Sequence, residues 1–151
     1  MAKKKVLFVA TVDSHIELFH LPYLKMFKDK GWEVHVATGE GKQIKYCDKK
    51  IVLPMKRSPY NLVANLKAVR QLKKIIKEEG YDIIHCHTPV GSVVARLAAK
   101  KAKARRNGTR VMYTAHGFHF YTGAPLLYWL LFYPVEWYLA KYTDTLILIN
   151  D

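Results

Sequence analysis

The chain has 151 residues, 50% of them hydrophobic, and carries 25 Lys and Arg against 12 Asp and Glu. This length fits one domain, and the apolar content allows a substantial core and excludes an intrinsically disordered chain. The formal net charge of +13 favours anionic partners such as acidic lipid surfaces, phosphorylated substrates or nucleic acid; the alternative is a basic surface with no specific ligand.

In chain order, the apolar periodicity predicts ten elements. They are a strand over 6–12, a helix over 16–30, strands over 32–38 and 49–53, a helix over 58–79, a strand over 81–87, a helix over 88–105, a strand over 110–115, a helix over 125–141 and a strand over 145–149. This alternation predicts an α/β fold with a doubly wound, mainly parallel sheet of about six or seven strands, Rossmann-like in kind.

Several boundaries rest on specific residues. Pro22 predicts that the regular part of the first helix begins near it, or that the preceding residues form a separate turn. Ser58 and Pro59, as a cap and a first helical residue, predict the start of the second helix, and Thr88 with the following proline repeats this pattern in the third.

The N-terminus resembles a signal peptide only in its basic start. The apolar run from Val6 to Ala10 is short and lacks a small-residue cleavage pattern, so a buried strand is the better interpretation. No apolar run approaches the roughly 20 residues of a membrane-spanning helix. Two cysteines without a CxxC pair, Cys47 and Cys86, indicate a reducing, cytosolic setting.

Polar residues accumulate where three of the predicted strands finish. They are Asp13, Ser14 and His15 after the first strand, His87 and Thr88 at the fourth, and Thr114, His116 and Gly117 at the fifth. Ligands of open α/β sheets bind outside the carboxyl ends of the strands. We therefore expect these three segments to converge on one binding edge.

The histidines at this edge allow two interpretations. His85 and His87 share a strand face and could hold a metal ion with His116, but no carboxylate or cysteine clusters with them. We favour packing of His85 inside and a rim position for His87, and expect no metal. A neutral His116 could hydrogen-bond a sugar hydroxyl or a backbone carbonyl near a reacting centre, or it could only orient its loop.

The helix after Thr88 carries the small residues Gly91 and Ser92 in its first turn. Its free N–H groups could receive an anion or a hydroxyl-rich ligand, while ordinary capping by Thr88 explains the pattern as well. Both interpretations stay open at this point.

Three further segments bear on membranes. Residues 126–133 are apolar all round, which fits a buried crossover helix, or one covered by another domain, slightly better than a helix lying in a membrane interface. The basic stretches 67–77 and 100–106 could attract acidic lipid head groups, or they could be solvated faces.

Some functions are disfavoured by missing motifs. No GxGxxG follows the first strand, and Glu33 stands at the start of the second strand, so NAD or FAD binding is not expected. The absence of a P-loop disfavours an NTPase. The absence of helix-turn-helix, RRM and zinc-finger patterns disfavours nucleic acid as a partner.

Five segments carry a resemblance to a known family. The segments VATVDSH, HLPYLK, GWEVHVAT and YDIIHCHTP together resemble the start of family 4 glycosyltransferases. The segment YTAHGFHF, followed by the apolar helix, is similar to bacterial capsule and exopolysaccharide members. The resemblance covers essentially the whole chain, and its specificity lies in the order and spacing of the segments.

The resemblance implies one half of a GT-B fold, in which the N-terminal domain binds mainly the acceptor and a C-terminal domain holds the nucleotide-sugar. It implies retaining transfer without a metal or other cofactor. It places His116 near the transferred sugar as the catalytic candidate, and the segment of Asp13, Ser14 and His15 near donor and acceptor. Many members carry a Gly-Gly pair in that segment, which this sequence replaces.

We accordingly expect residues 1–151 to be an acceptor-side domain that lacks its donor-binding partner domain and is inactive alone. The expected substrates are a nucleotide-sugar and a glycan acceptor linked to lipid, used in surface polysaccharide synthesis. The expected location is cytoplasmic, peripheral to the inner face of the membrane, with anionic lipid as a further partner. The alternative is a stand-alone binding module that pairs with a separate catalytic chain through an exposed apolar patch.

Overall fold

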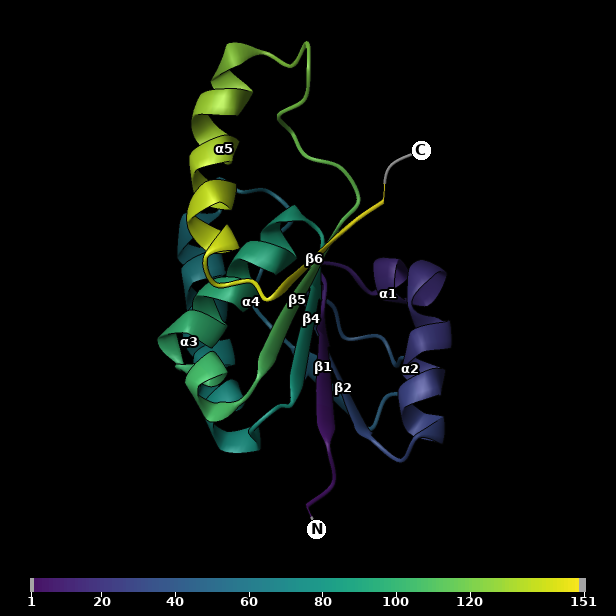
Figure 1. Ribbon diagram of the computed structural model, residues 1–151. Helices are drawn as coiled ribbons and strands as arrows, with labels where there is room; N and C mark the ends of the chain where they lie inside the picture. The colour runs from purple at the N-terminus through teal and green to yellow at the C-terminus, as the bar shows by residue number, and fades with distance from the viewer. Residues whose placement is uncertain (1, 150–151) are drawn as a thin grey trace.

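The computed structural model describes residues 2–149 and contains one six-stranded sheet with the order β3-β2-β1-β4-β5-β6 (Figure 1). All five neighbouring pairs are parallel. The strands are β1 (Lys5–Val9), β2 (Glu33–Thr38), β3 (Lys49–Val52), β4 (Ile83–His87), β5 (Arg110–Ala115) and β6 (Thr145–Leu148). The predicted Rossmann-like parallel sheet is confirmed, and its order reverses between β1 and β4, where such sheets bind ligands.

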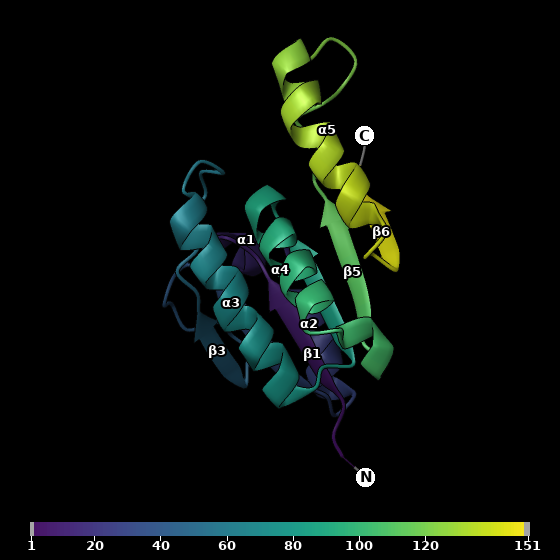
Figure 2. The same ribbon diagram turned by 90° about the vertical axis from the view of Figure 1, so that its left-hand side faces the viewer.

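Helices cover both faces of this sheet. They are α1 (Asp13–Phe19), α2 (Leu21–Asp29), α3 (Leu62–Glu79), α4 (Pro89–Lys101) and α5 (Leu126–Ala140), with a short 3-10 helix at Ala104–Asn107. Figure 1 shows α1 and α2 on one face and α3 and α4 on the other, and Figure 2 shows α3 and α4 side by side. Helix α5 lies on the α4 side and rises beyond the carboxyl edge of the sheet in both views.

The position of β1 between two helical layers explains why the residues from Val6 to Ala10 are all apolar. Leu7 and Val9 belong to the core cluster beneath α3 and α4, whereas Val6, Phe8 and Ala10 belong to the cluster beneath α1 and α2. All five are 0% exposed. A parallel strand between two helical layers buries both faces, so the alternation of polar and apolar residues disappears.

The first predicted helix is divided into two. His20 stands between α1 and α2, donating its backbone N–H to the Ile16 carbonyl oxygen and accepting from the N–H groups of Tyr23 and Leu24. Pro22, near the first position of α2, cannot donate a helical hydrogen bond, and this favours a new helix start. The separate turn suggested by Pro22 is therefore present, and it turns the His20 side chain inward, where it is 4% exposed.

The predicted start of the second helix at Ser58 is wrong. Helix α3 begins at Leu62, after Asn61. The Ser58 hydroxyl accepts from the N–H of Tyr60 instead, and the Asn65 side-chain amide donates to the Ser58 carbonyl oxygen. The serine thus closes a turn before the helix, a common competing use of its side chain.

The interpretation of α5 as a buried crossover helix is also wrong for the described residues, whereas the alternative, a helix covered by another domain, stays a prediction. Leu139 is the buried residue of this helix, and most of its other apolar side chains are exposed, as are those of the edge strand β6. The most exposed of them are Leu126, Leu127, Leu130, Trp137 and Leu148. Within residues 2–149, no helix combines the length and the hydropathy needed to span a bilayer.

Candidate functional site

Five histidines gather at the carboxyl ends of β4 and β5, against the α1–α2 junction. We call His15, His20, His85, His87 and His116 the histidine cluster. The ring centroids of His20 and His87 lie 3.7 Å apart, those of His85 and His87 4.1 Å, and those of His15 and His116 4.6 Å. Three segments that are distant in the sequence therefore converge at this edge, as the strand-end pattern predicted.

Burial keeps these imidazoles neutral at pH 7. It lowers the pKa of His15 and His85 to about 4 and that of His20 to about 3, and the positive charge that neighbouring histidines would acquire adds to the effect. Burial and the neighbouring histidines also lower the pKa of His87, and burial lowers that of His116. Neutral imidazoles offer both a donor and an acceptor nitrogen.

Most of the cluster has unused hydrogen-bonding capacity. His85 is an exception, because its Nε2 lies 2.8 Å from the Thr114 hydroxyl. His15 Nε2 and both ring nitrogens of His20 and His87 are buried without a partner among the described residues. Unpaired buried polar atoms are unfavourable, so such a group points to a ligand.

The structure corrects one expected position within this set. His87 was expected at the rim, but it is 0% exposed. His116 is the exposed member of the cluster and is accessible from outside. A ligand therefore meets His116 first and the other imidazoles behind it.

Asp13 does not face a substrate. It is 2% exposed and forms an ion pair of 2.8 Å with Lys50, while its carboxylate accepts from the Thr38 hydroxyl at 2.6 Å and the Lys42 N–H at 2.9 Å. Burial raises its pKa, but these bonds outweigh burial and lower the pKa overall. The carboxylate is turned toward these three residues of the same chain because Asp13 is the first residue of α1. We therefore leave Asp13 out of the proposed site.

The start of α4 is tied to the end of β1. Thr88 has a φ of 62°, and its hydroxyl lies 3.1 Å from the Thr11 N–H and 2.8 Å from the Thr11 hydroxyl. It forms no side-chain cap of α4, so the capping interpretation is wrong. A methyl group at Gly91 would meet Thr88 Oγ1 at 2.7 Å and the Thr11 nitrogen at 3.1 Å, which explains why a glycine stands there.

A large groove begins beside the cluster. Its volume is about 680 Å³, and it runs between the N-terminal part of α3, the start of α4, the segment after β5 and the middle of α5. His15, Thr88 and Gly117 line one part of it, and apolar side chains of α3, α4 and α5 line most of the rest. Gly117 has a φ of 137°, a conformation that favours glycine and sets the path of the chain from His116 into this wall.

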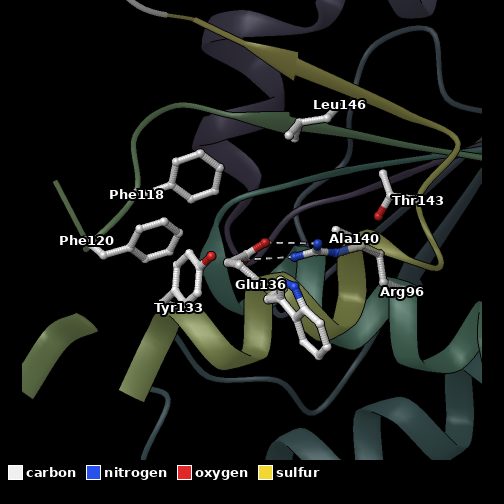
Figure 3. A pocket seen from close by; sticks show the side chains of 9 residues that line it. Arg96, Phe118, Phe120, Tyr133, Glu136, Ala140, Thr143 and Leu146 are labelled. Carbon is white, nitrogen blue, oxygen red and sulfur yellow. Dashed lines mark hydrogen bonds and ion pairs between the residues drawn. The ribbon is translucent and has the colours of Figure 1, made fainter. Parts of the chain in front are cut away.

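An ion pair fixes α5 as the outer wall of the groove; Figure 3 shows this pair in a smaller neighbouring pocket that Arg96 and Glu136 help to line. The buried Arg96 guanidinium donates to both carboxylate oxygens of Glu136, each at 3.0 Å, and lies 4.2 Å from the Tyr113 ring centroid. Arg96 also donates to the Ser92 carbonyl and hydroxyl oxygens, so its position is fixed from several sides. The bidentate pair joins α4 to α5 across 40 positions of the chain.

Of the predicted site residues, the structure brings together His15, His87 and His116, with Thr88 and Gly117 beside them in the groove wall. Ser14 is exposed on the first turn of α1 and lines neither the cluster nor the groove. Sequence reasoning missed His20, whose only signal was its place directly before Leu21 and Pro22, and it missed the Arg96–Glu136 pair, which spacing does not reveal.

Comparison with known proteins agrees with this arrangement. A parallel sheet in this order, with a polar cluster and an apolar groove at its carboxyl edge, is the doubly wound Rossmann-like arrangement, which binds ligands at this edge. The chain belongs to the glycosyl transferase 4-like family, whose model matches residues 5–150.

Three relatives support this assignment. The chain is 59% identical over 148 residues to the "Putative glycosyltransferase EpsD" of Bacillus subtilis (strain 168), covering 98% of this chain and 38% of that protein. It is 31% identical over 60% of its length to an Escherichia coli UDP-Gal:alpha-D-GlcNAc-diphosphoundecaprenol alpha-1,3-galactosyltransferase, of which it spans 22%. It is 28% identical over 66% of its length to the capsular polysaccharide biosynthesis glycosyltransferase CapM of Staphylococcus aureus, of which it spans 26%.

The fold is shared with more distant solved structures. MurG of Acinetobacter baumannii superposes with a TM-score of 0.62 at 14% identity, over 99% of this chain and 42% of that one. The chain thus spans well under half the length of the relatives it matches.

Proposed function

We propose that this chain is the acceptor-binding half of a retaining glycosyltransferase, which moves a sugar from a nucleotide-sugar to a lipid-linked glycan in surface polysaccharide synthesis. The observation that carries the proposal is the apolar groove of about 680 Å³ that begins at His15, Thr88 and Gly117, beside His116. A lipid-linked acceptor has a polar head and an apolar tail, and this site offers neutral imidazoles at one end and apolar walls along its length.

The names of two relatives support the same substrate class. One acts on a diphosphoundecaprenol-linked sugar, and another serves capsular polysaccharide biosynthesis. The donor half of the reaction, with the groups that stabilise the nucleotide diphosphate leaving group, belongs in this proposal to a second domain, and no metal ion takes part in the transfer. The exposed apolar surface of α5, together with the net charge of +13, supports attachment to the inner face of an anionic membrane.

Replacing Val135 by Glu is expected to raise the KM for a detergent-dispersed, lipid-linked acceptor at least about tenfold, because it puts a charge into the apolar groove. Val135 lines the groove and is 40% exposed. Initial rates are measured with the protein as expressed from its own gene, at varied acceptor and at varied nucleotide-sugar. The KM for the donor should stay the same.

Leu127→Glu is the matched control, because Leu127 lies on the same helix, is 59% exposed and is not part of the groove lining. Equal effects of the two substitutions on acceptor KM would count against the groove as the acceptor site.

His116→Ala is expected to lower kcat/KM by about 100-fold, the usual consequence of removing one hydrogen-bonding or proton-transferring group at a reacting centre. His116 is exposed, so the substitution should leave the midpoint of thermal unfolding nearly unchanged. His116→Gln, which keeps a hydrogen-bond donor, should lose less activity. Full activity of His116→Ala would remove this residue from the proposed mechanism.

A further inference from the structure

Four members of the histidine cluster come close enough to share one ligand. One nitrogen each from His15, His20, His87 and His116 lies within 4.8 Å of the others. These residues come from α1, the α1–α2 junction, the end of β4 and the segment after β5. His85 is not part of this group of four, and its Nε2 already pairs with Thr114.

The nitrogens of this group lack protein partners. His20 is 4% exposed and His87 0% exposed, and neither ring has a hydrogen-bonding partner among the described residues; His15 Nε2 is in the same situation. The Phe8 ring packs nearly parallel to His87 at 6.1 Å, so the side of the site toward the sheet is apolar. Several unpaired imidazole nitrogens close to one another are the ligand set that a transition-metal cation binds.

We propose that His15, His20, His87 and His116 form a binding site for a divalent transition-metal ion of the zinc class. Imidazole nitrogens bind Zn²⁺ at about 2.0–2.1 Å in a tetrahedron, in which the nitrogens are about 3.3 Å apart. Small side-chain rotations are needed to bring the four nitrogens to this separation. His15 and His116 are the less buried members of the group and have room for such rotations. Ca²⁺ and Mg²⁺ prefer oxygen ligands and are poor candidates.

A second group of potential ligands shows the contrast. Glu33, His35 and Glu79 also lie within reach of one another. However, His35 uses both nitrogens, at 2.8 Å to the Tyr81 hydroxyl and 2.6 Å to Glu33, while Glu79 holds Lys5 and Lys49. The polar atoms of this group are already hydrogen-bonded or ion-paired within the protein, so we do not expect the group to bind a metal.

Four protein ligands fill a tetrahedral zinc ion and leave no open position for substrate, so the site is one for structure or control rather than for catalysis. On the proposed function, a bound ion would also remove His116 from the acceptor and slow the transfer. The binding itself does not depend on that function and is tested without any enzyme assay.

The experiment titrates the purified chain, freed of any affinity-tag histidines and stripped with EDTA, with ZnCl2 in a calorimeter at pH 7.5. We expect one ion per chain with micromolar or tighter affinity. His20→Gln should weaken binding at least about 100-fold, since loss of a ligand exceeds the 10- to 100-fold effect of losing an outer-shell partner. Co²⁺ in place of Zn²⁺ should give the visible absorption of tetrahedral coordination.

His119→Gln is the control, because His119 is exposed and belongs to neither group of ligands. It should bind zinc like the unmodified chain. His116→Gln guards against misfolding of His20→Gln, since His116 is exposed, and it should weaken binding to a similar degree. Absence of saturable binding to the unmodified chain, or undiminished binding in His116→Gln, would overturn the proposal.

Discussion

Acidification below pH 6 is expected to unfold this protein in a steep transition when metal is withheld by a chelator. Buried histidines are responsible. Burial and the neighbouring imidazoles lower the pKa of His20 to about 3, and they lower the pKa of His87 as well. His15 and His85, with a pKa of about 4 each, act in the same direction. Other histidines of the cluster and aromatic rings such as Phe8 and Phe19 surround these groups, and no carboxylate pairs with a cluster member among the described residues.

The direction follows from proton binding. In the unfolded chain a histidine titrates near pH 6.5, so below that pH the unfolded state binds more protons than the folded state. The contribution of these neutral histidines to the free energy of unfolding is therefore fully present above pH 6.5. It is lost as the pH falls toward their pKa in the folded state. Each group gives about 1.4 kcal/mol per pH unit, so the two most buried, His20 and His87, give about 3 kcal/mol per pH unit.

Urea denaturation at pH 7.5, 6.5, 6.0 and 5.5 with EDTA measures this slope. His20→Leu should flatten it by about 1.4 kcal/mol per pH unit, whereas His119→Leu, at an exposed position, should not. A free energy of unfolding that is equal at pH 7.5 and 5.5 would show that the cluster is not neutral and buried as described.

Replacing Glu136 by Leu is expected to destabilise the fold by about 3–5 kcal/mol, because it leaves the buried Arg96 charge without its carboxylate. Arg96 is 1% exposed and has its bidentate contact with Glu136, so the substitution leaves a buried guanidinium without its carboxylate partner. Urea unfolding measures the loss. Fluorescence of Trp129 and Trp137 on α5 reports whether this helix detaches first.

The double variant Arg96→Met with Glu136→Leu separates charge burial from packing. Removing both charges should recover most of the stability, since apolar groups of similar volume commonly replace a buried ion pair without loss. If the double variant were as unstable as Glu136→Leu, lost packing between α4 and α5 would be the cause instead.

Much of the fold could be predicted, because a parallel sheet between helices imposes simple patterns. Continuous apolar runs marked the strands, and the rule that their carboxyl ends share an edge brought His15, His87 and His116 together correctly. Element types were more reliable than boundaries: β1 ends at Val9, where the sequence suggested residue 12.

That small shift explains the error at Asp13. Because the strand ends early, Asp13 begins a helix and turns inward to Lys50, and no local pattern reports which way a side chain at such a junction points. The Arg96–Glu136 pair and the place of His20 were equally inaccessible, since both depend on how distant segments pack. The burial of α5 within this chain was predicted wrongly because an all-apolar helix is usually buried, and the sequence does not reveal whether its own domain or another one covers it.

The central position of β1 governs how a newly translated chain can acquire its shape. β1 lies between β2 and β4, and the bonds that join its end to the start of α4 connect Thr11 to Thr88, 77 positions later. On the ribosome, the first strand must therefore wait for more than half of the domain before both of its edges are paired. Until then Leu7 and Val9 lack the helix α4 that covers them, so the nascent chain exposes an apolar strand face that can bind other apolar surfaces. We expect chaperones that bind emerging chains to engage this protein early.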